Sequence, residues 1–337
     1  MPTTLKLGTR KSKLAMIQAN LVKSSLEQTH ADVHVDIVGM STAGDRDNTT
    51  SLYTLGGADK GLWTKELENA LLDGSVDVIV HSLKDVQSQL PAGCVLGAFP
   101  AREDPTDALV VKHGLPYSTL EELPDGSVVG TSSIRRVAQL RRAFPRLTFK
   151  DVRGNLDTRI AKLDDPNGEF TAIILASAGL KRVSEEYTQR ITCRLTDPIL
   201  YAVGQGCLAL ETREGDAHVE QFISSINCKQ TQLAVTVERA LLRTLEGGCS
   251  APVGVETTVK EENGAHRIHF TANLTTLDGT TQIRQQLTRE VASLSDADAL
   301  GVDVAHLIQS SGGDKIMADI HDSKTNKIIE KTNIVQN

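Results

Sequence analysis

Residues 5–28 read LKLGTRKSKLAMIQANLVKSSLEQ, a short run with strand-like alternation that passes directly into an amphipathic helical pattern. The turn between them holds Gly8, Thr9 and Ser12, residue types that punctuate strands and cap helices. A similar turn recurs at residues 129–138, VGTSSIRRVA. The recurrence predicts two units in which strands alternate with helices, which is the pattern of an α/β fold.

The alternation continues outward from both turns. The other strand-like runs of the first unit are VHVDIVGM, VDVIVHS and CVLGAF, and those of the second are DALVV, SVVGT, LTFKDVR and TAIILAS. The units join around residues 99–107, and we expect the run CLALETR (207–213) to return to the first unit, because two-lobed proteins often cross their hinge twice. This predicts one α/β lobe over residues 1–103 and 205–226 and a second over residues 104–204.

The last third of the chain has a different character. Three strand-like runs, VGVETTVK, HRIHFTANLTTL and TTQIRQQLTREV, are separated by ENGA and LDGT, whose Asn-Gly and Asp-Gly pairs are typical of hairpin turns. A helical pattern follows from about residue 295 to 310 and ends at Gly312-Gly313. We expect a small α+β domain with a three-stranded antiparallel sheet over residues 227–320, and then a polar tail over 321–337.

The amino-acid composition of the chain argues against several classes of function. The net charge of -7 and the 3% aromatic content argue against a nucleic-acid partner. No apolar run approaches the roughly 20 residues that span a bilayer, and the first residues lack a signal-peptide pattern. We therefore expect a cytoplasmic protein without a membrane partner. The five cysteines are widely spaced and form no CxxC, so neither a disulfide framework nor a zinc site is indicated.

One region of this acidic chain is basic. Residues 130–162 hold nine basic and two acidic side chains, a local charge of +7. Cations lie at both turns, Arg10 and Lys13 at the first and Arg135 and Arg136 at the second, where a helix N-terminus disfavours them by roughly a few tenths of a kcal/mol each. A bound anion would reverse that effect, so both turns are candidate carboxylate sites. The alternative is ordinary N-capping by Thr9, Ser12, Thr131 or Ser132 with exposed arginines.

The run VDVIVHSLKDV (76–86) predicts a buried strand that delivers His81, Ser82, Lys84 and Asp85 at its carboxyl end, where open α/β sheets build their sites. Lys84 and Asp85 are either a surface ion pair or an anion-binding lysine beside a carboxylate that stabilises a cationic intermediate. We expect His81 to be a structural hydrogen-bonding residue.

The stretch ALLRTLEGGCSAPVG (240–254) places Cys249 on a glycine-flanked loop after a helix, where a thiol is exposed enough to react. Packing accounts for the other cysteines, which lie in or beside apolar runs or before a helix. Two other classes stay open at this point. A non-catalytic carboxylate-binding protein would need neither Cys249 nor Asp85, and a cysteine hydrolase would need a nearby base that no evident Cys-His pair supplies.

Eight motifs in order resemble the porphobilinogen deaminase (hydroxymethylbilane synthase) family over about residues 4–310. They are GTRKSKLA, DKGLWTKELE, VHSLKDV, VGTSSIRRVAQL, VRGNLDTRIAKLD, ILASAGLKR, AVGQGCLALE and LEGGCSAPVG. The resemblance implies two lobes like those of periplasmic binding proteins. It also implies a monomeric transferase of tetrapyrrole (heme) synthesis that joins four porphobilinogen molecules into hydroxymethylbilane and releases ammonia, without a metal.

The resemblance also assigns roles. It implies that Cys249 carries a dipyrromethane cofactor through a thioether and that Asp85 is the catalytic carboxylate, with Ser82 and Lys84 beside it in the cofactor site. Arg10, Ser12 and Gln18 match positions that face the incoming substrate. The remaining cofactor positions are Thr131, Ser132, Ser133, Arg135, Arg136, Arg153, Arg159 and Ala176.

The sequence departs from the family pattern in a few places. Gln87-Ser88 stands where Pro-Thr is usual, Trp63 where Phe is commoner, and Cys207 where Ala is typical. Lys60 and Lys65 flank the segment that resembles the family's active-site lid. The departures concern the local shape after Asp85, the packing of the lid and the labelling of thiols.

Overall fold

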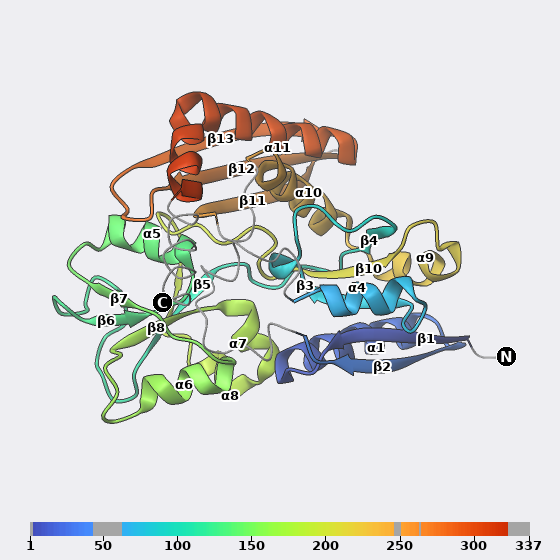
Figure 1. Cartoon of the computed structure of the whole chain (residues 1–337), viewed down its shortest axis with the longest axis horizontal. Coiled ribbons are helices and arrows are strands. Elements are labelled where there is room, and N and C mark those ends of the chain that lie inside the picture. Colours follow the sequence, from blue (N-terminus) through green and yellow to red (C-terminus); the bar gives the residue numbers. More distant parts are fainter. Residues whose placement is uncertain (1–2, 43–62, 246–250, 263, 323–337) are drawn as a thin grey trace, which may run out of the picture.

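The computed structural model describes residues 3–42, 63–245, 251–262 and 264–322, and these form two mixed five-stranded sheets and one three-stranded antiparallel sheet (Figure 1). The predicted fold class, two α/β lobes with a small α+β domain, is confirmed. We call the units lobe 1, lobe 2 and the third domain in the order in which their first strands occur.

Lobe 1 is built on a sheet of order β2-β1-β3-β10-β4. β1 is parallel to β2 and β3, and β10 is antiparallel to β3 and β4, so a strand that follows lobe 2 in sequence lies inside the sheet of lobe 1. Its elements are β1 (Thr3–Arg10), α1 (Lys13–Thr29), β2 (Val33–Met40), α4 (Lys65–Leu72), β3 (Val78–Ser82), the 3-10 turn η1 (Leu83–Asp85), β4 (Cys94–Ala98), β10 (Leu208–Arg213), α9 (Ala217–Ile223) and η2 (Ser224–Ile226).

Lobe 2 repeats the arrangement with the order β7-β6-β8-β5-β9. β6 is parallel to β7 and β8, while β5 is antiparallel to β8 and β9. Its elements are β5 (Asp107–Val111), β6 (Val128–Gly130), α5 (Ile134–Ala143), β7 (Thr148–Lys150), α6 (Leu156–Asp164), β8 (Ala172–Ala176), α7 (Ser177–Val183), α8 (Glu185–Gln189) and β9 (Cys193–Leu195).

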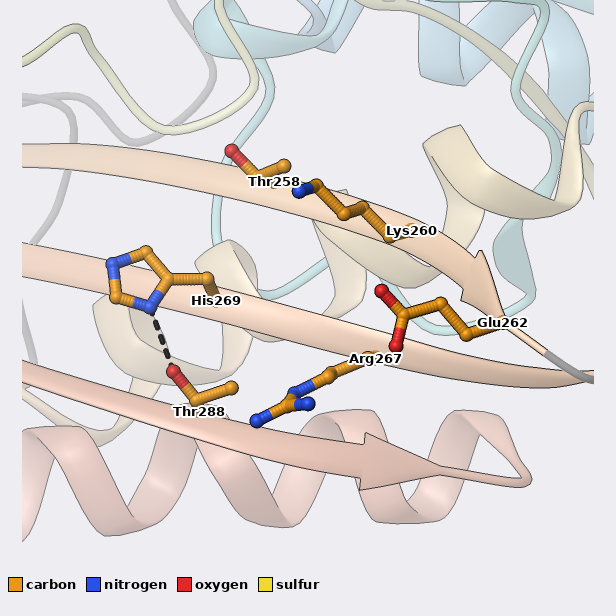
Figure 2. Close-up of a pocket in the computed structure, with 6 residues that line it drawn as sticks. All are labelled: Thr258, Lys260, Glu262, Arg267, His269 and Thr288. Carbon is orange, nitrogen blue, oxygen red and sulfur yellow. Dashed lines mark hydrogen bonds between the residues drawn. The ribbon is translucent and has the colours of Figure 1, made fainter.

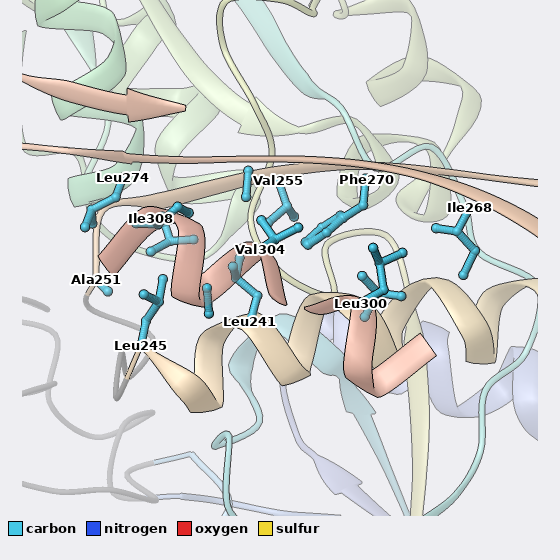
Figure 3. Packing of buried hydrophobic residues seen from close by; sticks show 14 of the residues in the cluster. Leu241, Leu245, Ala251, Val255, Ile268, Phe270, Leu274, Leu300, Val304 and Ile308 are labelled. Carbon is cyan, nitrogen blue, oxygen red and sulfur yellow. The ribbon is translucent and has the colours of Figure 1, made fainter. Parts of the chain in front are cut away.

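The third domain packs two helices against one face of its sheet (Figure 3). Alternate residues of the strands, including Ile268, Phe270 and Leu274, meet Leu241 and Val304 of the two helices in a buried apolar cluster. The helices cross closely, because a Cβ on Gly301 would lie 2.2 Å from the carbonyl oxygen of Val237. The elements are α10 (Lys229–Thr244), β11 (Val253–Glu262), β12 (Ala265–Thr275), β13 (Gln282–Val291), α11 (Leu294–Ile308) and a π-helical turn, η3 (Gln309–Gly313).

The junction between the lobes centres on one buried carboxylate. Asp107, the first residue of β5, accepts hydrogen bonds from Arg135 Nη1 (2.7 Å), Arg136 Nη2 (2.7 Å) and Gln205 Nε2 (2.8 Å). Gln205 also donates to the carbonyl of Pro105 at 2.7 Å, which ties together the two chain crossings between the lobes. Burial alone would raise the pKa of Asp107, but the two guanidinium groups hold it well below its usual range.

The third domain is attached to this junction by a second buried ion pair. Arg102, on the first crossing, pairs with Glu238 of α10 at 2.6 Å. The same carboxylate accepts hydrogen bonds from the backbone N–H of Gly204 (2.7 Å) and from Thr257 Oγ1 (2.8 Å). Glu238 therefore joins both crossings to the helix and to β11.

We predict that Asp107→Asn destabilises the protein by about 3 to 5 kcal/mol, because it leaves two buried arginines without their counter-charge. Thermal and urea unfolding measure the loss. Asp125→Asn is the matched control, since Asp125 pairs with Arg146 at 3.2 Å on the surface and its removal should cost about 1 kcal/mol or less. Equal losses in the two variants would contradict the central role of Asp107.

The stability of the protein should depend on pH through Asp107, and the direction of that dependence follows from its lowered pKa. The lowered pKa of Asp107 makes its contribution to stability fully present above the unfolded-state pKa of about 4 and lost as pH falls toward the folded-state value. Stability below about pH 4 should therefore fall more steeply in the parent protein than in Asp107→Asn.

Candidate functional site

A small pocket in lobe 1 brings together residues that are far apart in the sequence. The carboxyl ends of the parallel strands β1 and β3 lie side by side, so the residues that follow them meet at one edge of the sheet. The hollow comprises about 330 Å³ of empty space, part of it open solvent. Its lining residues are Thr9, Arg10, Ala15, Gln18, Trp63, Thr64, Leu67, Val80, His81, Ser82 and Asp85.

Four predicted site residues therefore share this pocket: Arg10, Gln18, Ser82 and Asp85. Gln18 is buried on the inner side of α1, and its Oε1 accepts the hydroxyl of Ser82 at 3.0 Å. The guanidinium of Arg10 lies 4.3 Å from the ring centroid of Trp63. Gln18 of α1 and Ser82 of β3 thus hold each other in place beside the hollow, and Arg10 of β1 lies against Trp63.

Asp85 differs from Gln18 and Ser82 in that its side chain makes no hydrogen bond with a described residue. It lies at the end of η1, directly after β3, and is exposed. Among the described residues, none donates a hydrogen bond to its carboxylate and none forms an ion pair with it. A carboxylate in this state remains available to a charge that develops on a ligand.

Lys84 and Arg159 are cations that the protein holds at an electrostatic cost. The pKa of Lys84 is lowered to about 8, chiefly by burial; Asp85 opposes the shift and Arg136 adds to it. The pKa of Arg159 is lowered to about 10, again chiefly by burial, with Arg136 and Arg153 adding to the shift and Asp151 opposing it. Both cations are therefore near Arg136, and repulsion from it contributes to both shifts.

Arg135 and Arg136 have a partner that sequence reasoning missed. Both bind Asp107, and each also donates to a carbonyl, Arg135 to Leu200 (2.6 Å) and Arg136 to Ile174 (2.7 Å). The Nε of Arg135 is buried and finds no hydrogen-bond acceptor among the described residues. The local charge of +7 read from residues 130–162 therefore overstates the positive charge here, since the balancing acid comes from β5.

The hydroxyl groups predicted for anion binding are engaged in local structure. Ser12 caps α1 by accepting the N–H of Ala15 (3.4 Å), and Ser133 caps α5 by accepting the N–H of Arg136 (3.4 Å). Thr131 Oγ1 accepts the N–H of Ser133 (3.3 Å), and Ser132 Oγ donates to the carbonyl of Val152 (2.7 Å). Of the four residues named in the N-capping alternative, only Ser12 caps a helix, and the cap of α5 is Ser133. Ala176 is half-buried at the end of β8.

Cys249 and Lys60 lie outside the described residues, and Lys65 begins α4 in an exposed position. The buried thiols are poor nucleophiles, because burial raises the pKa of Cys94 and of Cys207 to about 12. Cys207 is 1% exposed, so it does not compete in thiol labelling of the folded protein.

His81 makes the structural hydrogen bond expected of it. Its Nε2 lies 2.7 Å from Oε2 of Glu211, which is fully buried on the adjacent strand β10. Glu68 of α4 is buried nearby, and burial raises its pKa. No sequence signal links these residues, since 130 positions separate His81 from Glu211.

A second hollow lies on the outer face of the three-stranded sheet (Figure 2). In it His269 Nδ1 lies 2.7 Å from Thr288 Oγ1, and the lining mixes both signs of charge. None of the predicted site residues is among its lining residues, which are Thr258, Lys260, Glu262, Arg267, His269 and Thr288. The pocket in lobe 1 is therefore the candidate site.

Neither a cluster of His, Cys, Asp and Glu that could hold a metal ion nor a helix long and apolar enough to cross a membrane occurs among the described residues.

Comparison with solved structures gives only weak likenesses. The periplasmic aliphatic sulphonate binding protein SsuA from Escherichia coli is 18% identical, with a TM-score of 0.36, over 73% of this chain and 71% of that one. The methionine binding protein MetQ is 16% identical, with a TM-score of 0.38, over 68% of this chain and 93% of that one. Likenesses at this level say nothing about function.

Comparison of sequences is decisive. Residues 5–221 match the family model of the "porphobilinogen deaminase, dipyromethane cofactor binding domain", and residues 232–310 match that of the "porphobilinogen deaminase, C-terminal domain". The porphobilinogen deaminase of Yarrowia lipolytica is 47% identical over 94% of this chain and 93% of its own length. That of Prochlorococcus marinus is 45% identical over 94% of this chain and 96% of its own length. The chain belongs to the porphobilinogen deaminase family.

Proposed function

We propose that Asp85 is the carboxylate through which this enzyme, a porphobilinogen deaminase, joins four porphobilinogen molecules head to tail. The observation that carries the proposal is the exposed Asp85 carboxylate without a local partner, in one pocket with Arg10, Gln18 and Ser82. Loss of ammonia from the substrate breaks a C–N bond and leaves positive charge on the pyrrole methylene. A carboxylate already in position stabilises that charge as it develops, and it can accept the proton lost when the new C–C bond forms.

The basic side chains near Asp85 are proposed to bind the carboxylates of the substrate and of the growing chain. Each porphobilinogen carries an acetate and a propionate, so every addition brings two carboxylates into the protein. Lys84, Arg153 and Arg159 are proposed to bind carboxylates beside Asp85, and Arg10, with Gln18 and Ser12 next to it, to orient the incoming substrate. The lowered pKa values of Lys84 and Arg159 support this, because a bound anion relieves the repulsion that causes part of those shifts.

The described residues fit a dipyrromethane, a group with several carboxylates. Besides the cations near Asp85, the buried N–H at Nε of Arg135 has no acceptor of its own among the described residues. We propose that Cys249 forms the thioether to it and that Ser82, Lys84, Asp85, Thr131, Ser132, Ser133, Arg135, Arg136, Arg153, Arg159 and Ala176 surround it. When bound, the dipyrromethane supplies the primer from which the chain of pyrroles grows.

The domain boundaries, the location, the oligomeric state and the lack of other partners are proposals as well. We propose that residues 1–103 with 205–226, 104–204 and 227–320 act as three domains, with a polar tail from 321, and that the enzyme is a cytoplasmic monomer without a nucleic-acid or membrane partner. The family resemblance supports these assignments. Neither a non-catalytic carboxylate-binding protein nor a cysteine hydrolase explains the family membership.

Cys249→Ala should yield a protein whose intact mass lacks the dipyrromethane adduct and which has no turnover, because the attachment point is gone. Cys228→Ala is the matched control, since Cys228 is half-buried at the N-cap of α10 and should keep both the adduct and the activity. An adduct retained by Cys249→Ala would overturn the assignment.

Asp85→Asn should fold and load the cofactor but lose about 100-fold or more in kcat, as when other electrostatic stabilisers are removed. Asp151→Asn controls for a general loss of negative charge, because Asp151 is an exposed acid that also acts on Arg159. Turnover near that of the parent in loaded Asp85→Asn would count against the proposal.

The pKa of Lys84 gives a pH prediction. Binding of a carboxylate requires the charged lysine, and because its pKa is lowered to about 8, uptake of dipyrromethane by cofactor-free protein should decline as pH rises through about 8. Lys84→Arg keeps the charge at that pH and should remove the decline. The measurement is the loaded fraction by intact mass as a function of pH, and the same decline in Lys84→Arg would show that another group is responsible.

A further inference from the structure

The position of Asp85 depends on its backbone, because its side chain makes no hydrogen bond or ion pair with a described residue. On the N-terminal side the chain is held by β10, since the N–H of Leu83 donates to the carbonyl of Cys207 at 3.0 Å. On the C-terminal side Val86 is followed by Gln87 and Ser88, the pair at which this chain departs from the family pattern. What holds this second side therefore decides where the carboxylate lies.

One guanidinium meets all three carbonyls of that segment. Arg239 Nη2 donates to the carbonyls of Gln87 (2.7 Å) and Ser88 (3.3 Å), and Nη1 donates to that of Val86 (3.5 Å). Arg239 lies on α10, in the third domain, more than 150 residues along the chain from its acceptors. It makes no ion pair with any carboxylate of the described residues.

Packing supports the same contact. Val235 lies one helical turn before Arg239 on α10, and it belongs to the buried cluster that contains Leu83 and Val86 on either side of Asp85. Burial, with Arg243 nearby, lowers the pKa of Arg239 to about 10. Arg239 is half-buried, and its hydrogen bonds go to carbonyls and not to a paired carboxylate, although Glu211 acts on it favourably through space. Desolvating a cation in this way is costly, which argues for a task beyond general stability.

We propose that Arg239 is a positioning residue that fixes the catalytic carboxylate of Asp85 through the carbonyls of Val86, Gln87 and Ser88. The inference rests on the proposed role of Asp85. Because α10 also leads toward Cys249, the contact couples the place of the carboxylate to the domain that carries the cofactor cysteine.

The test uses the loaded enzyme. Arg239→Met removes the donors at similar length, and we expect a kcat loss of about tenfold or more with KM within about twofold, because small misplacements of reacting groups cost rate. Arg239→Lys keeps the charge on a single nitrogen but loses the planar fork that spans three carbonyls, so its kcat should fall less than that of Arg239→Met yet stay several-fold below that of the parent. Intact mass measures the loaded fraction, and thermal melting measures the fold.

Arg146 offers a matched control in lobe 2. Its guanidinium also binds three carbonyls of one segment, those of Leu120, Glu121 and Leu123, far along the chain from Asp85. Arg146→Met should lower the melting temperature while kcat stays within about twofold of the parent. An equal fall in kcat in Arg146→Met and Arg239→Met, or full turnover in loaded Arg239→Met, would overturn the proposal. Should Arg239→Met fail to fold, full turnover in Arg239→Lys would overturn it equally.

The double variant Arg239→Met/Asp85→Asn separates this inference from the function on which it rests. If Arg239 acts through Asp85, the double variant should be no slower than Asp85→Asn alone. Multiplied losses would contradict the positioning role only, whereas near-normal turnover of Asp85→Asn would contradict the role of Asp85 itself.

Discussion

The junction between the two lobes is built around the buried charge of Asp107. This carboxylate is 1% exposed and is shared by Arg135, Arg136 and Gln205, which reach it from α5 and from the second crossing between the lobes. A buried carboxylate is tolerated only when it is fully paired, and two buried guanidinium groups need the same compensation. Removal of any one of these three charged groups would therefore leave the others buried without full compensation. The cluster lies where the chain passes from one lobe to the other.

The third domain is also held by a buried ion pair, between Arg102 and Glu238. Arg102 lies over the ring of Tyr201, 5.0 Å from its centroid, and binds Glu238 of α10 with both terminal nitrogens. Gln139 of α5 adds a neutral link, because it binds the backbone of Leu200 and the amide of Asn273 on β12. The domain thus contacts both crossings and α5 through buried polar groups.

The sequence was a better guide to the helices, strands and motifs than to the side chains that pair with one another across the fold. Strand and helix periodicity was sufficient for the two α/β lobes and the three-stranded sheet, and the residues that follow β3 were correctly expected at the carboxyl end of a sheet strand. The periodicity could not show that Asp107 neutralises Arg135 and Arg136, because charge pairs across the fold leave no local pattern. For the same reason Glu211 and Arg239 went unnoticed, since their contacts join positions more than 120 residues apart. The roles of the site residues came from family resemblance and not from physical chemistry.

The strand β10 has a consequence for the order in which the protein is made. Within the described sheet, β4 pairs with β10 alone, and β10 separates it from β3. As the ribosome extends the chain, β4 emerges more than a hundred residues before its neighbour. The first lobe therefore cannot complete its sheet until the whole second lobe has been synthesised. During that interval β3 and β4 expose unpaired edges, which makes the nascent chain a natural substrate for chaperones.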